Sequence, residues 1–164
     1  VFMPNIIKDG AIVADIYQVI VEAGSLPNND IIVSLDIWLS QKEAVLAHPY
    51  KKGVMLKPDQ HPEAIIESLT QLDIIALDFP AFADGRGYSY AVLLRQRYGF
   101  TGELRATGDV FKDNLFYLKR CGFNSFAVRA DKDLQVSLQG LTDFSEVYQA
   151  SIDQNQPLYR RRFA

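Results

Sequence analysis

The chain has 164 residues, of which 48% are apolar and 23% charged, and its formal net charge is −3. This length suits one domain with a real core, and the charge gives no electrostatic footprint for nucleic acid. No apolar run reaches the roughly 18 residues that a membrane span needs, and no basic region followed by an apolar core indicates a signal peptide. We expect a single domain over residues 1–164, working in the cytoplasm, without nucleic acid or membrane as a partner.

The first 24 residues predict an arm that precedes the main fold. Asp9 and Gly10 lie between two apolar runs, which is typical of a β-hairpin turn. We expect this arm, residues 1–24, to cover a sheet edge or to contact a partner. At the other end, residues 151–164 form a polar tail that becomes basic.

The body of the chain alternates between strand and helix patterns about five times. The expected strands are 31–38, 53–58, 73–79, 102–107 and 123–129. The expected helices are 40–48, 61–72, 88–99, 110–122 and 131–141, with a further helical stretch at 142–150. Such alternation predicts an α/β domain of about five parallel β-α units with right-handed crossovers.

Two closures of this sheet remain open from the sequence. A partial β/α-barrel-like sheet keeps its strands in chain order with the helices on one face, whereas an open doubly wound sheet has helices on both faces. Hydrophobic periodicity does not distinguish them. The recurrence of polar residues after successive strands favours the barrel-like form.

These polar residues define the candidate site. Ligands of parallel α/β sheets gather at the carboxyl ends of the strands. The charged residues expected at that end are Asp36, Lys57, Asp78, Asp84, Arg86 and Asp109. Acids around a lysine suit proton transfer, so the candidate catalytic residues are Lys57, Asp78 and Asp109. The alternative is that such acids cap helices or bind local backbone.

The loop from Asp84 to Tyr88 is the most specific feature. Gly85 and Gly87 flank Arg86, and a helix is expected to start directly afterwards. Free N–H groups at a helix start favour an anion, and an arginine can add a bidentate contact. The loop therefore predicts an anion site, with a tight turn in which Arg86 pairs with Asp78 or Asp84 as the alternative.

The next expected strand, 102–107, is also followed by a glycine and an acid at the start of a helix. Gly108 and Asp109 follow it, and Asp109 is expected to cap the helix that begins at Val110. Arg105 lies inside the strand, where a buried charge needs a partner, and Asp78 on the neighbouring strand is a candidate. We include Arg105 and Gly108 in the predicted anion site.

The remaining reactive side chains predict no further site. Cys121 ends a helix without a second cysteine and is expected to be packed and inert. His48 and His61 adjoin prolines and are expected at the surface. We expect no metal site, and because no dinucleotide, haem or iron–sulfur motif is present, the cofactor stays unknown.

The central motifs resemble the DUF934 proteins, a bacterial family of unknown function. The matching residues are Asp78-Phe79-Pro80, Phe82, Asp84 to Ser89, Leu104-Arg105, Gly108-Asp109-Val110 and Arg120 to Phe123. The likeness extends over roughly residues 30–162. Members of this family commonly carry the label of a probable oxidoreductase involved in sulfite reduction, so the resemblance implies a place in sulfate assimilation and cysteine biosynthesis.

Three hypotheses follow. The first is a non-catalytic accessory protein in sulfite reduction, which binds the reductase, another sulfate-assimilation protein or a small anion. The second is a β/α enzyme for an anionic small molecule, in which Arg86 and its flanking glycines hold the anion, Lys57 or Asp109 moves protons, and Asp78 orients Arg105. The third is a homodimer built from the N-terminal arm and apolar helix faces.

Overall fold

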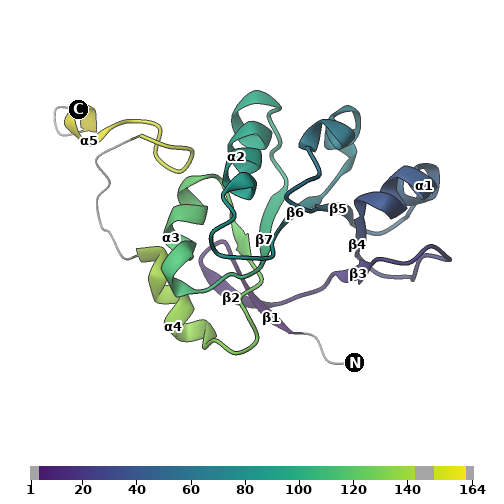
Figure 1. The fold of residues 1–164 in the computed structure, drawn as a ribbon, viewed down its shortest axis with the longest axis horizontal. Helices are drawn as coiled ribbons and strands as arrows, with labels where there is room; N and C mark the ends of the chain where they lie inside the picture. Colours follow the sequence, from purple (N-terminus) through teal and green to yellow (C-terminus); the bar gives the residue numbers. More distant parts are fainter. Residues whose placement is uncertain (1–3, 143–149, 162–164) are drawn as a thin grey trace.

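The computed structural model describes residues 4–142 and 150–161, and Figure 1 shows one continuous sheet with helices along its outer side. The sheet has eight strands in the order β2-β1-β8-β7-β6-β5-β4-β3. From β3 to β8 the strands run parallel and in chain order. Right-handed crossovers between neighbours in chain order place their helices on one face. The barrel-like expectation is therefore confirmed, in the form of a curled half-barrel.

The parallel strands are short, and all but the edge strand β3 are largely buried. They are β3 (Gln18–Ile20), β4 (Ile31–Ser34), β5 (Lys52–Leu56), β6 (Ile74–Phe79), β7 (Glu103–Gly108) and β8 (Ser125–Phe126). Their apolar, β-branched composition is what strands covered on both faces require. The central pair, β6 and β7, is in register over all six residues of each strand.

The predicted hairpin is present over residues 5–14, whereas residues 18–20 of the expected arm form β3 of the parallel sheet. Strands β1 (Asn5–Lys8) and β2 (Ala11–Ala14) pair antiparallel, and β1 also pairs antiparallel with β8. Asp9 and Gly10 form the turn with φ of 50° and 79°, the left-handed conformation that a two-residue hairpin turn requires. The arm thus extends the parallel sheet beyond β8.

The helices lie between the strands. They are α1 (Leu35–Leu46), the 3₁₀ helix η1 (Pro62–Gln71), α2 (Arg86–Val92), the π-helical η2 (Leu93–Arg97), α3 (Lys112–Arg120), α4 (Leu134–Gln139), the 3₁₀ turn η3 (Gly140–Thr142) and α5 (Leu158–Arg161). The helix expected at 142–150 lies outside the described residues except at its two ends. None of the described helices is long and apolar enough to cross a membrane.

Two sequence expectations about these elements are wrong. The strand expected at 31–38 ends at Ser34, whose hydroxyl accepts a hydrogen bond from the Ile37 N–H and so caps α1. Trp38 is consequently a buried helix residue, and Ser40 lies inside the helix instead of opening it. The second error concerns 61–72, which forms a 3₁₀ helix where an amphipathic α-helix was expected.

The two faces of the sheet differ in chemistry. The outer, helix-covered face holds the main apolar core, with Leu77, Phe79 and Leu104 as fully buried examples. The inner face has a small apolar cluster of Ile32, Ile74 and Ala76, against which Tyr17 and Met55 pack. Along β7 the inner face is charged, because Glu103 and Arg105 alternate with the apolar residues of the outer face.

Candidate functional site

The turns after β6 and β7 meet at the carboxyl end of the sheet, which we call the rim. Phe79 and Gly108, the last residues of these strands, are register partners. The Phe82 N–H donates to Asp109 Oδ2 at 2.9 Å, so the two turns are joined directly. Gly108 has φ of 92°, and a Cβ there would lie 2.3 Å from the Phe79 carbonyl oxygen. The glycine is therefore required for this close approach.

In the loop that was predicted to bind an anion, the Asp84 carboxylate already binds Arg86. Asp84 accepts hydrogen bonds from the Arg86 N–H at 3.2 Å, from Arg86 Nε at 3.1 Å and from Arg86 Nη2 at 2.8 Å. These hydrogen bonds lower the pKa of the Asp84 carboxyl and raise the pKa of Arg86. The start of α2 and its arginine are thus satisfied within the loop, as in the tight-turn alternative.

The other members of the loop pack against the core. A Cβ on Gly87 would lie 2.5 Å from the Phe79 ring, so this glycine lets α2 approach β6. The Tyr88 ring contacts Phe79 and Tyr117 edge to face, with centroid distances of 5.2 and 5.6 Å. Gly85 is the N-cap of α2 and has open space around it. Gly87 and Tyr88 consequently have clear structural roles.

Asp109 belongs to a second charged cluster at the rim. Arg129 Nη1 donates to Asp109 Oδ1 at 2.8 Å, while Arg129 Nε and Nη2 both reach Asp131 at 3.1 Å. The two carboxylates raise the pKa of Arg129. Asp109 does not cap α3 with its side chain: the Asn114 side chain reaches back to the Phe111 N–H instead. Arg129 and Asp131 are the members of this cluster that sequence reasoning missed.

Asp78 and Thr107 come together at the rim. They are register partners on β6 and β7, and Thr107 Oγ1 donates to Asp78 Oδ1 at 3.3 Å. Side chains alternate along a strand, which places both on the inner side of the half-barrel. Lys57 directly follows Leu56, the last residue of the neighbouring strand β5, and its backbone N–H donates to Gln60 Oε1 at 2.9 Å.

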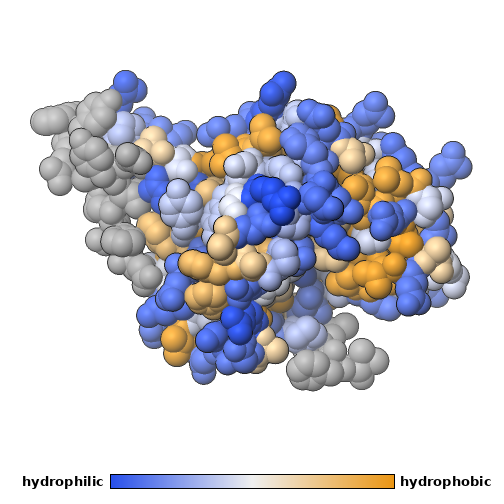
Figure 2. All heavy atoms as spheres, in the orientation of Figure 1, coloured by the Kyte–Doolittle hydropathy of each residue, from blue (hydrophilic) through white to orange (hydrophobic). Residues whose placement is uncertain are grey.

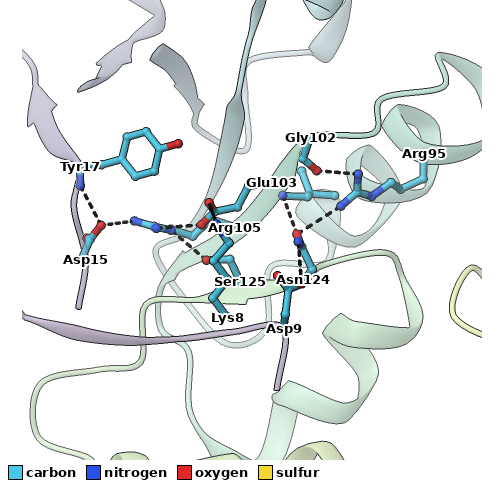
Figure 3. Close-up of polar contacts among 11 residues, drawn as sticks. Lys8, Asp9, Asp15, Tyr17, Arg95, Gly102, Glu103, Arg105, Asn124 and Ser125 are labelled. Carbon is cyan, nitrogen blue, oxygen red and sulfur yellow. Dashed lines mark hydrogen bonds and ion pairs between the residues drawn. The ribbon is translucent and has the colours of Figure 1, made fainter. Parts of the chain in front are cut away.

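Arg105 lies deeper on the inner face and is 3% exposed (Figure 3). Its guanidinium donates to Ser125 Oγ at 3.0 Å, Asp15 Oδ1 at 2.9 Å and Glu103 Oε1 at 2.8 Å. Asp15 and Glu103 are thus its carboxylate partners in place of Asp78. Asp78 is the register partner of Thr107, which lies two residues nearer the rim than Arg105. Lys8 Nζ adds a contact to Glu103 Oε2 at 3.0 Å.

The Arg105 cluster also ties the linker after the hairpin to the sheet. Asp15 lies in the segment between β2 and β3, and the Tyr17 ring centroid is 5.3 Å from the Arg105 guanidinium carbon. Burial raises the pKa of Tyr17, and the nearby Glu103 adds to this. For Glu103, burial acts to raise the pKa, but the hydrogen bond from Ser125 and the charge of Arg105 outweigh it and leave the pKa lowered.

The predicted site residues therefore separate into four places. Asp84 and Arg86 lie at the start of α2, and Asp109 joins Arg129. Asp78 faces the inner side with Thr107, and Arg105 lies deeper on that side with other partners. Within the described part of the chain, no group of three or more His, Cys, Asp or Glu side chains has a metal-binding arrangement. Cys121 is buried, and burial raises the pKa of its thiol, as an unreactive cysteine requires.

An apolar patch at the opposite edge of the sheet was not found from the sequence. Among the described residues β3 is the last strand on this side, so one edge of its backbone has no strand partner. The exposed apolar residues lie on both sides of this edge: Val19 of β3 and Val21 just after it are 50% and 63% exposed, and Leu39 of α1 is 64% exposed. Gln41 of α1 exchanges hydrogen bonds with Gly24 and holds the loop after β3 against the helix. Figure 2 shows hydrophobic residues gathered over α1 and β3.

These features define an α/β half-barrel with a charged rim at the carboxyl ends of its strands and an apolar patch at one edge. A family model described as a bacterial protein of unknown function (DUF934) matches residues 53–159. The chain belongs to this family, and the resemblance carried by its motifs is confirmed. The matched segment runs from β5 to α5 and contains the loop after β6 and the turn after β7. No curated protein matches the chain.

Proposed function

We propose that this protein is a non-catalytic accessory factor of assimilatory sulfite reduction that docks on the sulfite reductase or on another sulfate-assimilation protein. The pathway part of this proposal rests on the family label that the resemblance brings with it. The docking part rests on the patch of Val19, Val21 and Leu39 at the open edge of the sheet.

The patch has two properties that suit a protein partner. An unpaired strand edge can accept a strand from another chain through main-chain hydrogen bonds. Exposed aliphatic side chains beside it supply apolar area for the centre of an interface. By contrast, a small anion at Arg86 would have to compete with Asp84, which makes three hydrogen bonds to that residue. Partner docking is therefore better supported than anion delivery.

The direct test is the affinity between the purified chain and the sulfite reductase of the same bacterium, measured by calorimetry. We expect Val21→Asp and Leu39→Asp each to weaken binding about tenfold or more, because a charge would be buried at the interface. Val136→Asp is the matched control, since Val136 is 49% exposed but lies on α4. Wild-type affinity in the two patch variants, or no binding at all, would refute docking through this patch.

The contact between Asp78 and Thr107, with Lys57 at the end of the neighbouring strand, favours a second candidate function. Here the chain is an enzyme for an anionic small molecule, with Lys57 as the cation at the rim and Asp78 as the proton acceptor. A thermal-shift screen with sulfite, sulfate, phosphate, nucleotides and flavins tests it. Stabilisation that is lost in Asp78→Asn but kept in Arg86→Ala supports this site. Stabilisation that is lost only in Arg86→Ala supports the anion loop instead.

A further inference from the structure

A cavity of about 550 Å³ lies at the end of the sheet opposite the rim. It is enclosed by the β1–β2 turn, the end of α3, the residues that lead into β8, and the α4–η3 segment. The Asp9 N–H donates to the Asn124 carbonyl oxygen at 2.8 Å, which fixes the hairpin turn against the start of β8. This volume falls within the range of small-molecule sites in proteins.

The inner wall of the cavity is apolar and rigid. Phe123, Phe126 and Leu141 line it, and they are only 2%, 2% and 7% exposed. Leu138 of α4 adds a half-buried side chain. Phe123 is also packed edge to face on Phe79, with ring centroids 5.8 Å apart. The wall is thus part of the main core, and Leu138 is the most accessible of its four lining side chains.

The polar lining holds one cation, Lys119, and one carboxylate, Asp9. Lys119 is exposed and makes no ion pair with another described residue. The exposed Gln139 and Thr142 also line the cavity. Asp9 is the acidic lining residue, and its Oδ1 already accepts from Asn124 Nδ2 at 3.1 Å. The Thr142 hydroxyl donates to the Gln139 carbonyl oxygen at 3.1 Å, so the Lys119 ammonium and the Gln139 amide are the donors that suit a carboxylate or sulfonate head group.

We propose that this cavity binds a small amphipathic anion, with an aliphatic or aromatic body against the Phe123–Phe126 wall and a carboxylate or sulfonate head at Lys119. The site lies away from the rim and away from the edge patch. The cavity proposal therefore does not depend on the docking proposed above, and either proposal can be wrong while the other is right.

Three probes with the same chain length test the proposal: octanoate, 1-octanol and octylamine, titrated into the full chain and followed by amide NMR and calorimetry. Octanoate is expected to shift resonances of the cavity wall and to bind about tenfold more tightly than octylamine, because one charge-assisted contact contributes this much. Resonance changes confined to other regions, equal affinity for the amine, or no binding of octanoate would overturn the proposal.

Two variants locate the site. Lys119→Gln is a surface change that should keep the fold, and it is expected to remove the preference for octanoate over octylamine. Leu138→Trp should fill the cavity and weaken all three probes. Lys132→Gln is the matched control, since Lys132 is an exposed lysine outside the cavity. Loss of the preference in Lys132→Gln, with Lys119→Gln unchanged, would contradict the assigned head-group position.

Discussion

The half-barrel contains two arginine clusters with the same chemistry in different surroundings. Arg105 lies between Asp15 and Glu103 on the inner face, with 3% of its side chain exposed. Arg129 lies between Asp109 and Asp131 at the rim, with 40% exposed. Both guanidinium groups have ion pairs of 2.8 to 3.1 Å. The two guanidinium groups differ most in their access to water.

This difference decides what each cluster can do. Removing one partner from a buried ion pair leaves an uncompensated charge in a medium of low dielectric constant, whereas an exposed pair is replaced by water at little loss. The Arg105 cluster therefore holds the linker after the hairpin to the sheet. The rim cluster contributes little to stability, and its groups can exchange partners with a ligand or another protein.

The largest expected effect comes from Arg105→Ala. The variant leaves Asp15 without its cation and Glu103 with Lys8 alone, and we expect the free energy of unfolding to fall by about 3–5 kcal/mol. Urea titration followed by circular dichroism measures this. Arg129→Ala is the control, and it should keep nearly the wild-type urea midpoint. Equal losses in the two variants would remove the distinction between the clusters.

Replacing all three charged residues of the buried cluster should lower the free energy of unfolding much less than removing Arg105 alone. The triple variant Asp15→Ala, Glu103→Leu, Arg105→Met removes the three charges together. Buried ion pairs replaced by apolar groups of similar volume are often neutral in stability. We expect the triple variant to recover most of the stability that Arg105→Ala loses, as measured by the same urea titration. A triple variant less stable than Arg105→Ala would show that the charges are needed for more than mutual neutralisation.

Acidification should weaken the buried cluster through Glu103. Its pKa is lowered in the folded protein, so the ionised form stabilises the fold. This contribution is complete above the ordinary pKa of an unfolded glutamate, about 4.3, and is lost as the pH falls through the lower folded pKa. Urea titrations at a series of pH values below about 5 should show a shallower decline in Glu103→Gln than in wild type. If the free energy of unfolding declined equally in Glu103→Gln and wild type, the pKa of Glu103 would not be lowered in the folded protein.

The smallest effect is expected at the loop after β6. Asp84→Asn weakens the ion pair with Arg86, whose side chain is 57% exposed. The amide oxygen of asparagine can still accept the Arg86 N–H, so the start of α2 keeps its cap. We expect the thermal midpoint to stay close to wild type in a calorimetric scan. A large fall would indicate that the Asp84–Arg86 pair is far less solvated than its exposure suggests.

Much of the fold follows from patterns that the sequence carries locally. The Asp9-Gly10 turn and the alternation of strands and helices depend on residues close in the chain, and both are observed. The boundary at Ser34 could not be placed, because Ile31 to Trp38 reads as one apolar run whether its second half is strand or helix. The Ser34 hydroxyl accepts a hydrogen bond from the Ile37 N–H and so marks the start of the helix. Ser34 could not be recognised as a helix cap because it lies inside an apolar run.

The candidate site was less predictable, because its contacts join distant parts of the chain. That the turns after β6 and β7 share one rim follows from parallel topology alone. The partners of Arg105 do not follow, since Asp15 is 90 residues away and reaches the inner face only because the linker crosses it. Likewise, Arg129 lies beyond a two-residue strand, and nothing in its local sequence points to Asp109.

A double-mutant cycle between Asp15 and Arg105 tests most directly whether buried charge holds the linker to the inner face. The free energies of unfolding of wild type, Asp15→Ala, Arg105→Ala and the double variant give the coupling between the two residues. We predict a coupling of at least about 1.5 kcal/mol, as expected for a close pair shielded from water. Additive effects of the two substitutions would contradict the account, because they would show that Asp15 does not pair with Arg105 in solution.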